Sequence, residues 1–476
     1  MKSSPRFPFN EYILISLVLF LFANCFFYTY HNAIPLVKSD GWRFVQIYLV
    51  PWYEGHFNWS ILWSDHHPQP LTATLFIFNA EIFGLRMDYE ALFAIPFLLF
   101  SLILINKSIK QTLSPNRNII LYYILIALIA SVLFSLTSTA PYTWSLVSLG
   151  IVARFFSVLA IQSIDIYLYR KQTAAQITLT IIGLSALLIM FSSSAKVYLY
   201  SCLAVLLINI AFTPNKKYCI APAAVIIASI IFQRLFFSIV GDGGKYGEKE
   251  LIISIVENSK FIEDYILYIG TGLSSAWLNL PATSKLLGIT QESLAPFSAF
   301  ILLFYIVTLF VYFRKGLSTK STMPGTLILA SLLTAIGAAI FRYNPETQSF
   351  MAGNVPRYYT LYGAGMIGVL WTWAWVLIKA PTSRIIHIFS VVMVFLILSS
   401  QFVSSASAWR KSTYLHKSIL NTHSVMLRNS RGDLSVKPPR FMVGSNYPEP
   451  YLKSLSFLAE YNLNLFNDDN LINKYE

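Results

Sequence analysis

The sequence predicts an all-α polytopic membrane protein with about 11 transmembrane helices, and three observations favour this class. Of the 476 residues, 55% are hydrophobic and only 12% are charged, with a mean hydropathy of +0.58. A soluble domain carries roughly 25% charged residues. Apolar runs of about 20 residues, each long enough to cross a hydrocarbon core of about 30 Å, recur from end to end. Because each run must satisfy its own backbone hydrogen bonds in lipid, these runs should be helices.

The predicted spans are apolar runs separated by short loops, many of them basic. They cover residues 11–30, 89–106, 118–137, 146–168, 176–194, 197–213, 218–240, 297–313, 323–342, 358–378 and 385–404. The basic loops follow every second span, for example Lys107 and Lys110 after the second and Lys216 and Lys217 after the sixth. By the positive-inside rule, the N-terminus is cytoplasmic and the C-terminus lies outside. The net charge of +13 therefore reflects topology and not a nucleic-acid partner.

Two further apolar stretches are interpreted as helices that lie on, or dip into, the outer face of the membrane. "LTATLFIFNAEIFGL" (71–85) is short and contains Asn79 and Glu81, and the second stretch, 264–280, contains two glycines. Counting either stretch alone as a span would move the basic "FRKG" at 313–316 to the outer side.

This topology divides the chain into a transmembrane domain, residues 1–404, and an outer C-terminal segment, residues 405–476. The first outer loop is 31–88 and the second is 241–296. No sizeable cytoplasmic segment is left to bind a nucleotide, and "GDGGKYG" in the second loop lacks the Lys-Ser/Thr ending of a phosphate loop. The three cysteines indicate neither a disulfide framework nor a metal site.

The first outer loop carries the candidate catalytic groups. Asp40 stands in "DGWRF" and Asp65 in "WSDHHPQPL", and either carboxylate could act as a general base. The alternative is that loop acids are merely solvated and that the tryptophans only anchor the loop at the interface. His66 and His67 could join Asp65 in a metal site, but hydrogen bonding is favoured because adjacent histidines rarely share a metal.

Cations near the outer ends of spans are candidates for binding an anion. Arg154 and Lys196 lie in or at the edge of apolar runs, where a charge costs about 2.5–3.5 kcal/mol and should have a partner. For Lys196, snorkelling at a helix end is the alternative. Arg342 and Arg357 flank one outer loop, and Arg357 is preferred because it begins a span. Arginine suits phosphate because its planar fork binds two oxygens.

The layout of a first span, a long outer loop with an early acid, a surface helix and a second span resembles the GT-C glycosyltransferases. The resemblance is carried by "DGWRFVQIYLVPWYEGHFNWSILWSDHHPQPLTATLFIFNAEIFG" (40–84), by Arg357-Tyr358 in "NVPRYYTLYGAGM" and by "LAEYNLNLF" (458–466). In size and span count the chain is similar to serotype-converting O-antigen glucosyltransferases. One departure is His67, which stands where the family pattern has an arginine. If that arginine binds the donor phosphate, the role here would fall to Arg43, Arg357 or Lys196.

The resemblance implies an inverting hexosyltransferase of the bacterial inner membrane. It would move a sugar from a polyprenyl-phosphate donor to a surface glycan, such as O-antigen or lipopolysaccharide, on the periplasmic face, with membrane lipids and a glycan or lipid-linked acceptor as partners, and no metal or other cofactor. Asp40 is the first choice for the base, and Asp65 is the second choice or a sugar ligand. The expected phosphate ligands are Arg357, Lys196, Arg43 and His67, and the expected sugar or acceptor contacts are Trp42, His66, Glu54 and Tyr358.

Two alternatives stay open. An O-antigen polymerase joins diphosphate-linked repeat units and resembles proteins with two large arginine-bearing outer loops, whereas this chain has one such loop near its start. A lipid-linked-oligosaccharide flippase or other transporter should bury ionisable groups at mid-membrane and have halves of matching topology, and the sequence shows few such groups and no repeat.

Overall fold

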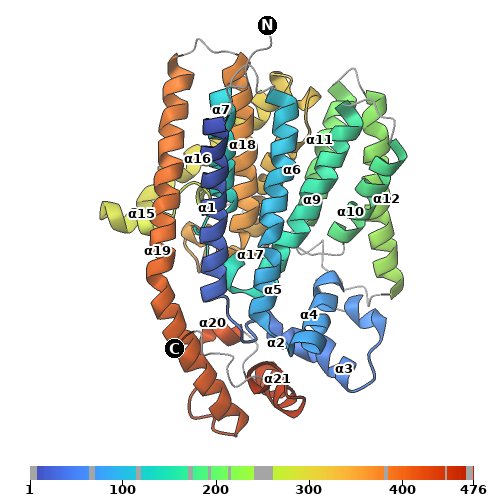
Figure 1. The fold of residues 1–476 in the computed structure, drawn as a ribbon, viewed down its shortest axis with the longest axis vertical. Coiled ribbons are helices and arrows are strands. Elements are labelled where there is room, and N and C mark those ends of the chain that lie inside the picture. Colours follow the sequence, from blue (N-terminus) through green and yellow to red (C-terminus); the bar gives the residue numbers. More distant parts are fainter. Residues whose placement is uncertain are drawn as a thin grey trace.

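The computed structural model describes residues 8–63, 70–113, 119–169, 175–190, 195–212, 216–240, 261–379, 384–444, 448–467 and 475. Within these residues the regular structure is entirely helical (Figure 1). Eight of the described helices are long and apolar enough to cross a membrane. The chain is therefore a multi-pass membrane protein, and the prediction of an all-α polytopic class is confirmed.

Each of the eleven predicted spans contains a helix. They are α1 (Pro8–Asn32), α5 with α6 (Met87–Ala94, Pro96–Leu113), α7 (Ile119–Leu133), α9 (Ser145–Tyr169), α10 (Ala175–Met190), α11 (Lys196–Phe212), α12 (Lys216–Val240), α16 (Ala295–Arg314), α17 (Met323–Arg342), α18 (Tyr359–Lys379) and α19 (Arg384–Ser430). Three of these helices, α7, α10 and α11, have 15 to 17 residues and are not among the eight. A total of about 11 spans therefore stays a prediction.

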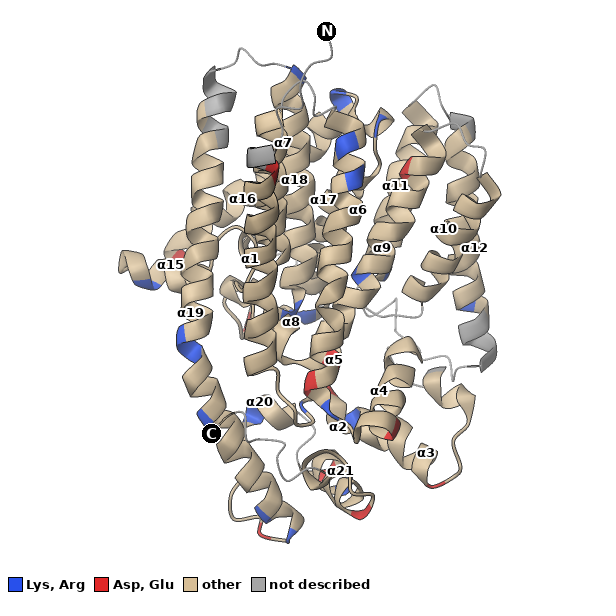
Figure 2. Ribbon diagram, in the orientation of Figure 1, with Lys and Arg blue, Asp and Glu red and all other residues tan. Residues whose placement is uncertain are grey.

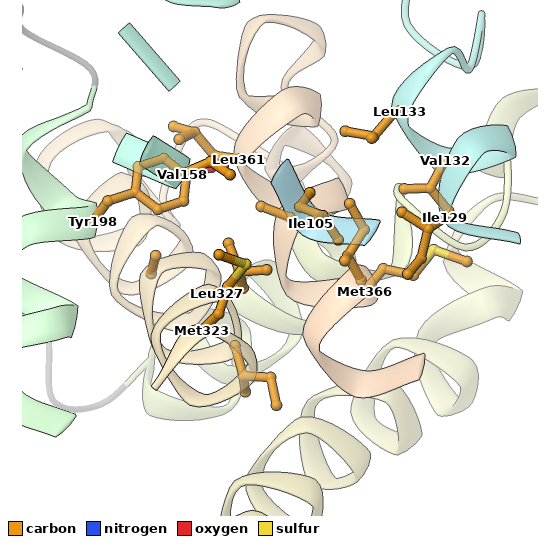
Figure 3. Packing of buried hydrophobic residues seen from close by; sticks show 14 of the residues in the cluster. Ile105, Ile129, Val132, Leu133, Val158, Tyr198, Met323, Leu327, Leu361 and Met366 are labelled. Carbon is orange, nitrogen blue, oxygen red and sulfur yellow. The ribbon is translucent and has the colours of Figure 1, made fainter. Parts of the chain in front are cut away.

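The bundle packs around one continuous apolar core, in which side chains from α6, α7, α9, α11, α17 and α18 meet (Figure 3). Small residues let two of these helices approach closely. A Cβ on Gly368 of α18 would lie 2.5 Å from the carbonyl oxygen of Pro324 in α17, so only glycine fits there. Lys and Arg gather mainly near the two ends of the bundle and beyond one of them (Figure 2), as expected for a membrane-spanning body.

The two short apolar stretches both form helices. The first is α4 (Pro70–Phe83), which lies beyond the end of the bundle that is opposite to the N-terminus (Figure 1). The second is α14 (Ile262–Ser274), which packs against α16 and α17 and has a buried C-terminal half. At 13 residues and 1.5 Å per residue, α14 is about 20 Å long, which is too short to cross a core of about 30 Å.

Residues 33–63, 70–86, 410–444 and 448–467 together form a cap on that end of the bundle. Its elements are α2 (Asp40–Phe44), the π-helical turn η1 (Val45–Leu49), α3 (Val50–Tyr53), η2 (Trp59–Trp63), α4, the end of α19, α20 (Arg440–Val443), α21 (Glu449–Glu460) and η10 (Asn464–Phe466). The first outer loop and the C-terminal segment thus share one hydrophobic core. Because α19 is continuous to Ser430, the predicted boundary at 404/405 falls inside a helix.

Hydrogen bonds between the two ends of the chain hold the cap together. Asn464 is fully buried, and its Nδ2 donates to the carbonyl oxygens of Pro35 at 2.9 Å and Leu85 at 2.7 Å. Its backbone N–H donates to the carbonyl of Gly84 at 2.7 Å. The element at 458–466 therefore fixes the path of the loop that leads to Asp40.

The remaining described elements are short segments that lie between the longer helices along the chain. They are α8 (Ala140–Thr143), α15 (Leu280–Leu287), η5 (Glu292–Leu294), η6 (Leu317–Thr319), η7 (Phe350–Gly353) and η8 (Pro356–Tyr358).

Candidate active site

A cavity of about 320 Å³ lies where the cap meets the bundle. Its wall is built from α2 and α4 of the cap, and from α9, α11, α17 and α18 with their connecting segments. Among the described residues, the charged side chains on this wall are Asp40, Arg43, Arg154, Arg342 and Arg357. These four arginines and one aspartate carry a formal charge of +3, which suits an anionic ligand.

Asp40 is the first residue of α2, and it is exposed on the cavity wall. The residue before it, Ser39, has φ of 50° and ψ of −118°, a conformation that a residue with a side chain rarely adopts. The carbonyl oxygen of Met442 maintains this conformation, because it accepts the Ser39 N–H at 2.6 Å and the Trp42 Nε1–H at 3.0 Å. The C-terminal part of the cap therefore sets the direction in which Asp40 leaves the backbone.

Arg357 and Arg342 share an aromatic neighbour at the rim of the cavity. The guanidinium carbons of Arg357 and Arg342 lie 5.3 Å and 5.4 Å from the centre of the Tyr358 ring, within the range of cation–π attraction. Ser138 holds this turn by donating its hydroxyl to the Pro356 carbonyl at 2.7 Å. The Nε of Arg357 is buried and has no hydrogen-bond partner in the described chain.

Arg154 is the most enclosed cation of the cavity. It stands on α9 with 7% of its surface exposed, and its Nη1 donates to the Thr360 carbonyl at 2.6 Å. Its Nη2 is buried and makes no hydrogen bond to any described residue. Because a cation in a span costs about 2.5–3.5 kcal/mol and should have a partner, this guanidinium donor is a candidate contact for an anion in the cavity.

The structure brings four of the predicted site residues together on one wall, Asp40, Arg43, Arg357 and Tyr358. Asp65, His66 and His67 lie outside the described residues. Lys196 is the first residue of α11 and does not line the cavity, although its neighbours Ala195 and Tyr198 do.

Trp42 and Glu54 are also placed away from the cavity. Trp42 is 0% exposed, and its indole packs edge-on to Tyr451 with ring centres 4.8 Å apart. It supports α2 and presents no face for a sugar to stack on. Glu54 is exposed at the end of α3, where its Oε2 lies 3.6 Å from the Nδ1 of His56.

Sequence reasoning missed Lys38, which lies close to the cavity. Its Nζ is 5.1 Å from the centre of the Trp144 ring, and Trp144 lines the cavity. A second aromatic ring, Phe441 of the cap, lies 5.6 Å away. Burial lowers the pKa of the Lys38 ammonium to about 8. Only its position two residues before Asp40 could have singled it out.

The described residues contain no group of three or more His, Cys, Asp and Glu side chains that could hold a metal ion. The expectation of metal-free chemistry stays a prediction.

Two comparisons of the chain with known proteins found no match. No family model matches it, and no curated protein matches its sequence. The geometry of the cavity is therefore what bears on function: a carboxylate able to accept a proton stands on the same wall as guanidinium groups able to bind an anion.

Proposed function

We propose that the chain is an inverting glycosyltransferase of GT-C type in a bacterial inner membrane. Its donor is a sugar attached through phosphate to a polyprenyl chain, and its acceptor is a surface glycan under assembly on the periplasmic face. In the topology proposed with it, which has about 11 spans, a cytoplasmic N-terminus and a periplasmic C-terminus, the cavity lies on that face. The observation that carries the proposal is that Asp40 and four arginines line one cavity between the cap and the spans.

In the proposed reaction a hydroxyl oxygen of the acceptor attacks the anomeric carbon of the donor sugar. The bond from that carbon to the phosphate oxygen breaks, and its electron pair stays on the phosphate. Asp40 takes the proton from the hydroxyl, and this proton later passes to solvent. Arg357 and its neighbours stabilise the negative charge that develops on the leaving phosphate, because arginine binds phosphate oxygens in pairs.

The size and position of the cavity support this ligand. A volume of about 320 Å³ is at the lower end of ordinary ligand pockets. It can hold a sugar with its phosphate but not a long isoprenoid chain, which would stay in the bilayer. The cavity is bounded by the ends of α9, α11 and α18, so a phosphate bound there remains attached to a lipid tail beside the bundle.

The buried acid Asp165 does not favour the transporter alternative. It is 2% exposed on α9, and its Oδ1 accepts hydrogen bonds from the Thr322 N–H at 2.6 Å and from the Thr322 hydroxyl at 2.5 Å. Its Oδ2 accepts the hydroxyl of Ser321. The carboxylate thus satisfies the N-terminus of α17 and has a structural role, as expected for an acid at a helix start.

The test is a transfer assay on the full chain in lipid nanodiscs. A radiolabelled polyprenyl-linked sugar and a lipid-linked acceptor are supplied, and wild type is compared with Asp40→Asn. Loss of a general base should lower the rate by about 10²–10⁴-fold. The control is Glu449→Gln, because Glu449 is exposed in the cap, pairs with Lys453 at 2.7 Å and lies outside the cavity.

Undiminished transfer by Asp40→Asn would remove Asp40 from the mechanism. Movement of the labelled lipid across the bilayer, without formation of a new glycosidic bond, would replace the proposed function with transport.

A further inference from the structure

The charge on the cavity wall is larger than a single phosphate requires. In the part of the wall that the structure describes, four arginines and one aspartate give a formal charge of +3. A sugar linked to a lipid through one phosphate carries one negative charge, whereas a sugar linked through a diphosphate carries two. When Asp40 accepts the proton, the wall reaches +4 while the leaving group gains one negative charge. The charge of the diphosphate is closer in magnitude to that of the wall, both before and after Asp40 accepts the proton.

The arginines also occupy two separate positions. Arg342 and Arg357 stand together at the rim, beside the Tyr358 ring. Arg154 comes from another helix and is anchored to the carbonyl of Thr360. Thr360 is three residues further along the chain than Arg357, so the carbonyl that holds Arg154 and the backbone of Arg357 are roughly 5 Å apart along the axis. The two guanidinium groups thus enter the cavity from different elements, and a diphosphate offers each of them its own phosphate.

The hydrogen-bonding state of these side chains points the same way. The Nη2 of Arg154 and the Nε of Arg357 are both buried, and neither has a hydrogen-bond partner in the described chain. Buried polar groups in folded proteins are nearly always paired. A phosphate that contacts only the arginines at the rim would leave the Arg154 donor unsatisfied. A second phosphate deeper in the cavity would satisfy both.

We infer that the donor linkage is a diphosphate, with one phosphate at Arg357 and Arg342 and the other at Arg154. This inference rests on the proposed function and narrows its substrate class, since the sequence predicts a monophosphate leaving group. The reaction is otherwise unchanged. The bond between the anomeric carbon and the diphosphate oxygen breaks, the electron pair stays on that oxygen, and polyprenyl diphosphate leaves.

The test measures binding and needs no transfer. Full-length protein in nanodiscs is titrated with polyprenyl monophosphate and with polyprenyl diphosphate of equal chain length, and affinity is read by microscale thermophoresis. Because the second phosphate gains charge-assisted hydrogen bonds, wild type should bind the diphosphate at least about tenfold more tightly. Arg154→Gln should reduce this preference to about twofold or less, with its affinity for the monophosphate nearly unchanged.

The matched variant is Arg357→Gln, which should weaken both lipids by similar factors because both place a phosphate at the rim. Equal affinity of wild type for the two lipids would overturn the inference. So would an Arg154→Gln variant that retains the full preference or loses affinity for both lipids equally.

The outcomes separate this inference from the proposed function. Transfer from a monophosphate donor, with no preference for diphosphate in binding, refutes the inference alone. Tight binding of the diphosphate, with no transfer from any donor, refutes the proposed function alone.

Discussion

Replacing Asn464 with alanine should loosen the cap more than any other single polar substitution in its C-terminal part. The side chain is fully buried and bridges two stretches of the first outer loop through the Pro35 and Leu85 carbonyls. Its Oδ1 also lies 3.4 Å from the Val37 N–H, a weaker contact. Asn464→Ala leaves the Leu85 carbonyl buried without a donor, which costs about 1–3 kcal/mol. It also removes one of the two donors to the Pro35 carbonyl, which still accepts the Met87 N–H at 3.3 Å, at a cost of about 0.5–1.5 kcal/mol.

The backbone adds a smaller penalty. Asn464 has φ of 55°, in the left-handed region that asparagine tolerates and that costs alanine about 1 kcal/mol. The free energy of cap opening should therefore fall by about 2.5–5.5 kcal/mol. Asn462 provides a matched control, since it has φ of 52° but is exposed, and its side chain makes no hydrogen bond to the described residues. Asn462→Ala should cost only about 1 kcal/mol.

Pulse proteolysis in increasing urea measures this difference, because cleavage of the cap follows the population of the open form. A gap of about 2 kcal/mol or more between the variants corresponds to roughly a 30-fold larger open population for Asn464→Ala. Similar cleavage of the two variants would show that the bridging hydrogen bonds do not hold the cap, and the placement of Asp40 would then lack its support.

Three other substitutions test separate parts of the structure. Gly270→Ala should lower the melting temperature, because the new Cβ would lie 2.4 Å from a backbone carbonyl oxygen of α16. The control is Gly337→Ala, whose Cβ would have nothing within 4 Å and should leave the melting temperature unchanged. Equal melting temperatures of the two variants would contradict the close approach at Gly270. Hydrogen bonds, chiefly from Ser435, lower the pKa of the Asp433 carboxyl to about 2. The ionised carboxylate therefore stabilises the folded state fully above the ordinary pKa near 4, and this stabilisation is lost as the pH falls toward 2. Asp433→Asn should remove that part of the acid transition in a fluorescence titration, and an unchanged curve would refute the assignment. Trp42→Phe keeps a buried ring but loses the hydrogen bond from the indole N–H to the Met442 carbonyl, so the free energy of unfolding in urea should fall by about 1 kcal/mol. An unchanged free energy would show that this hydrogen bond does not stabilise the cap.

The spans could be predicted because each is a local property of the sequence. An apolar run in lipid has to be a helix, so the stretches 146–168 and 323–342 fall within one or two residues of α9 and α17. The same reasoning identified Arg154 as a cation that needs a partner. What local pattern could not supply was the length of the last helix, since α19 continues as a half-exposed helix far beyond residue 404.

The cap could not be predicted because its contacts join opposite ends of the chain. Trp42 reads as an interfacial anchor or a sugar platform, and only its hydrogen bond to Met442, 400 residues away, shows that it supports α2. The resemblance places Tyr358 in the site, whereas the sequence gives Arg342, 16 residues earlier, a lower rank than Arg357 because only Arg357 begins a span. Arg342 and Tyr358 meet because α17 and α18 pack side by side.

A structure of the full chain with a bound, non-hydrolysable polyprenyl-linked sugar tests the central claim most directly. The account predicts phosphate density within hydrogen-bonding distance of Arg357 and Arg154, with the anomeric carbon on the side of Asp40 and the lipid tail leaving between the spans. A lipid bound elsewhere on the bundle, with its phosphate remote from all four cavity arginines, would contradict it.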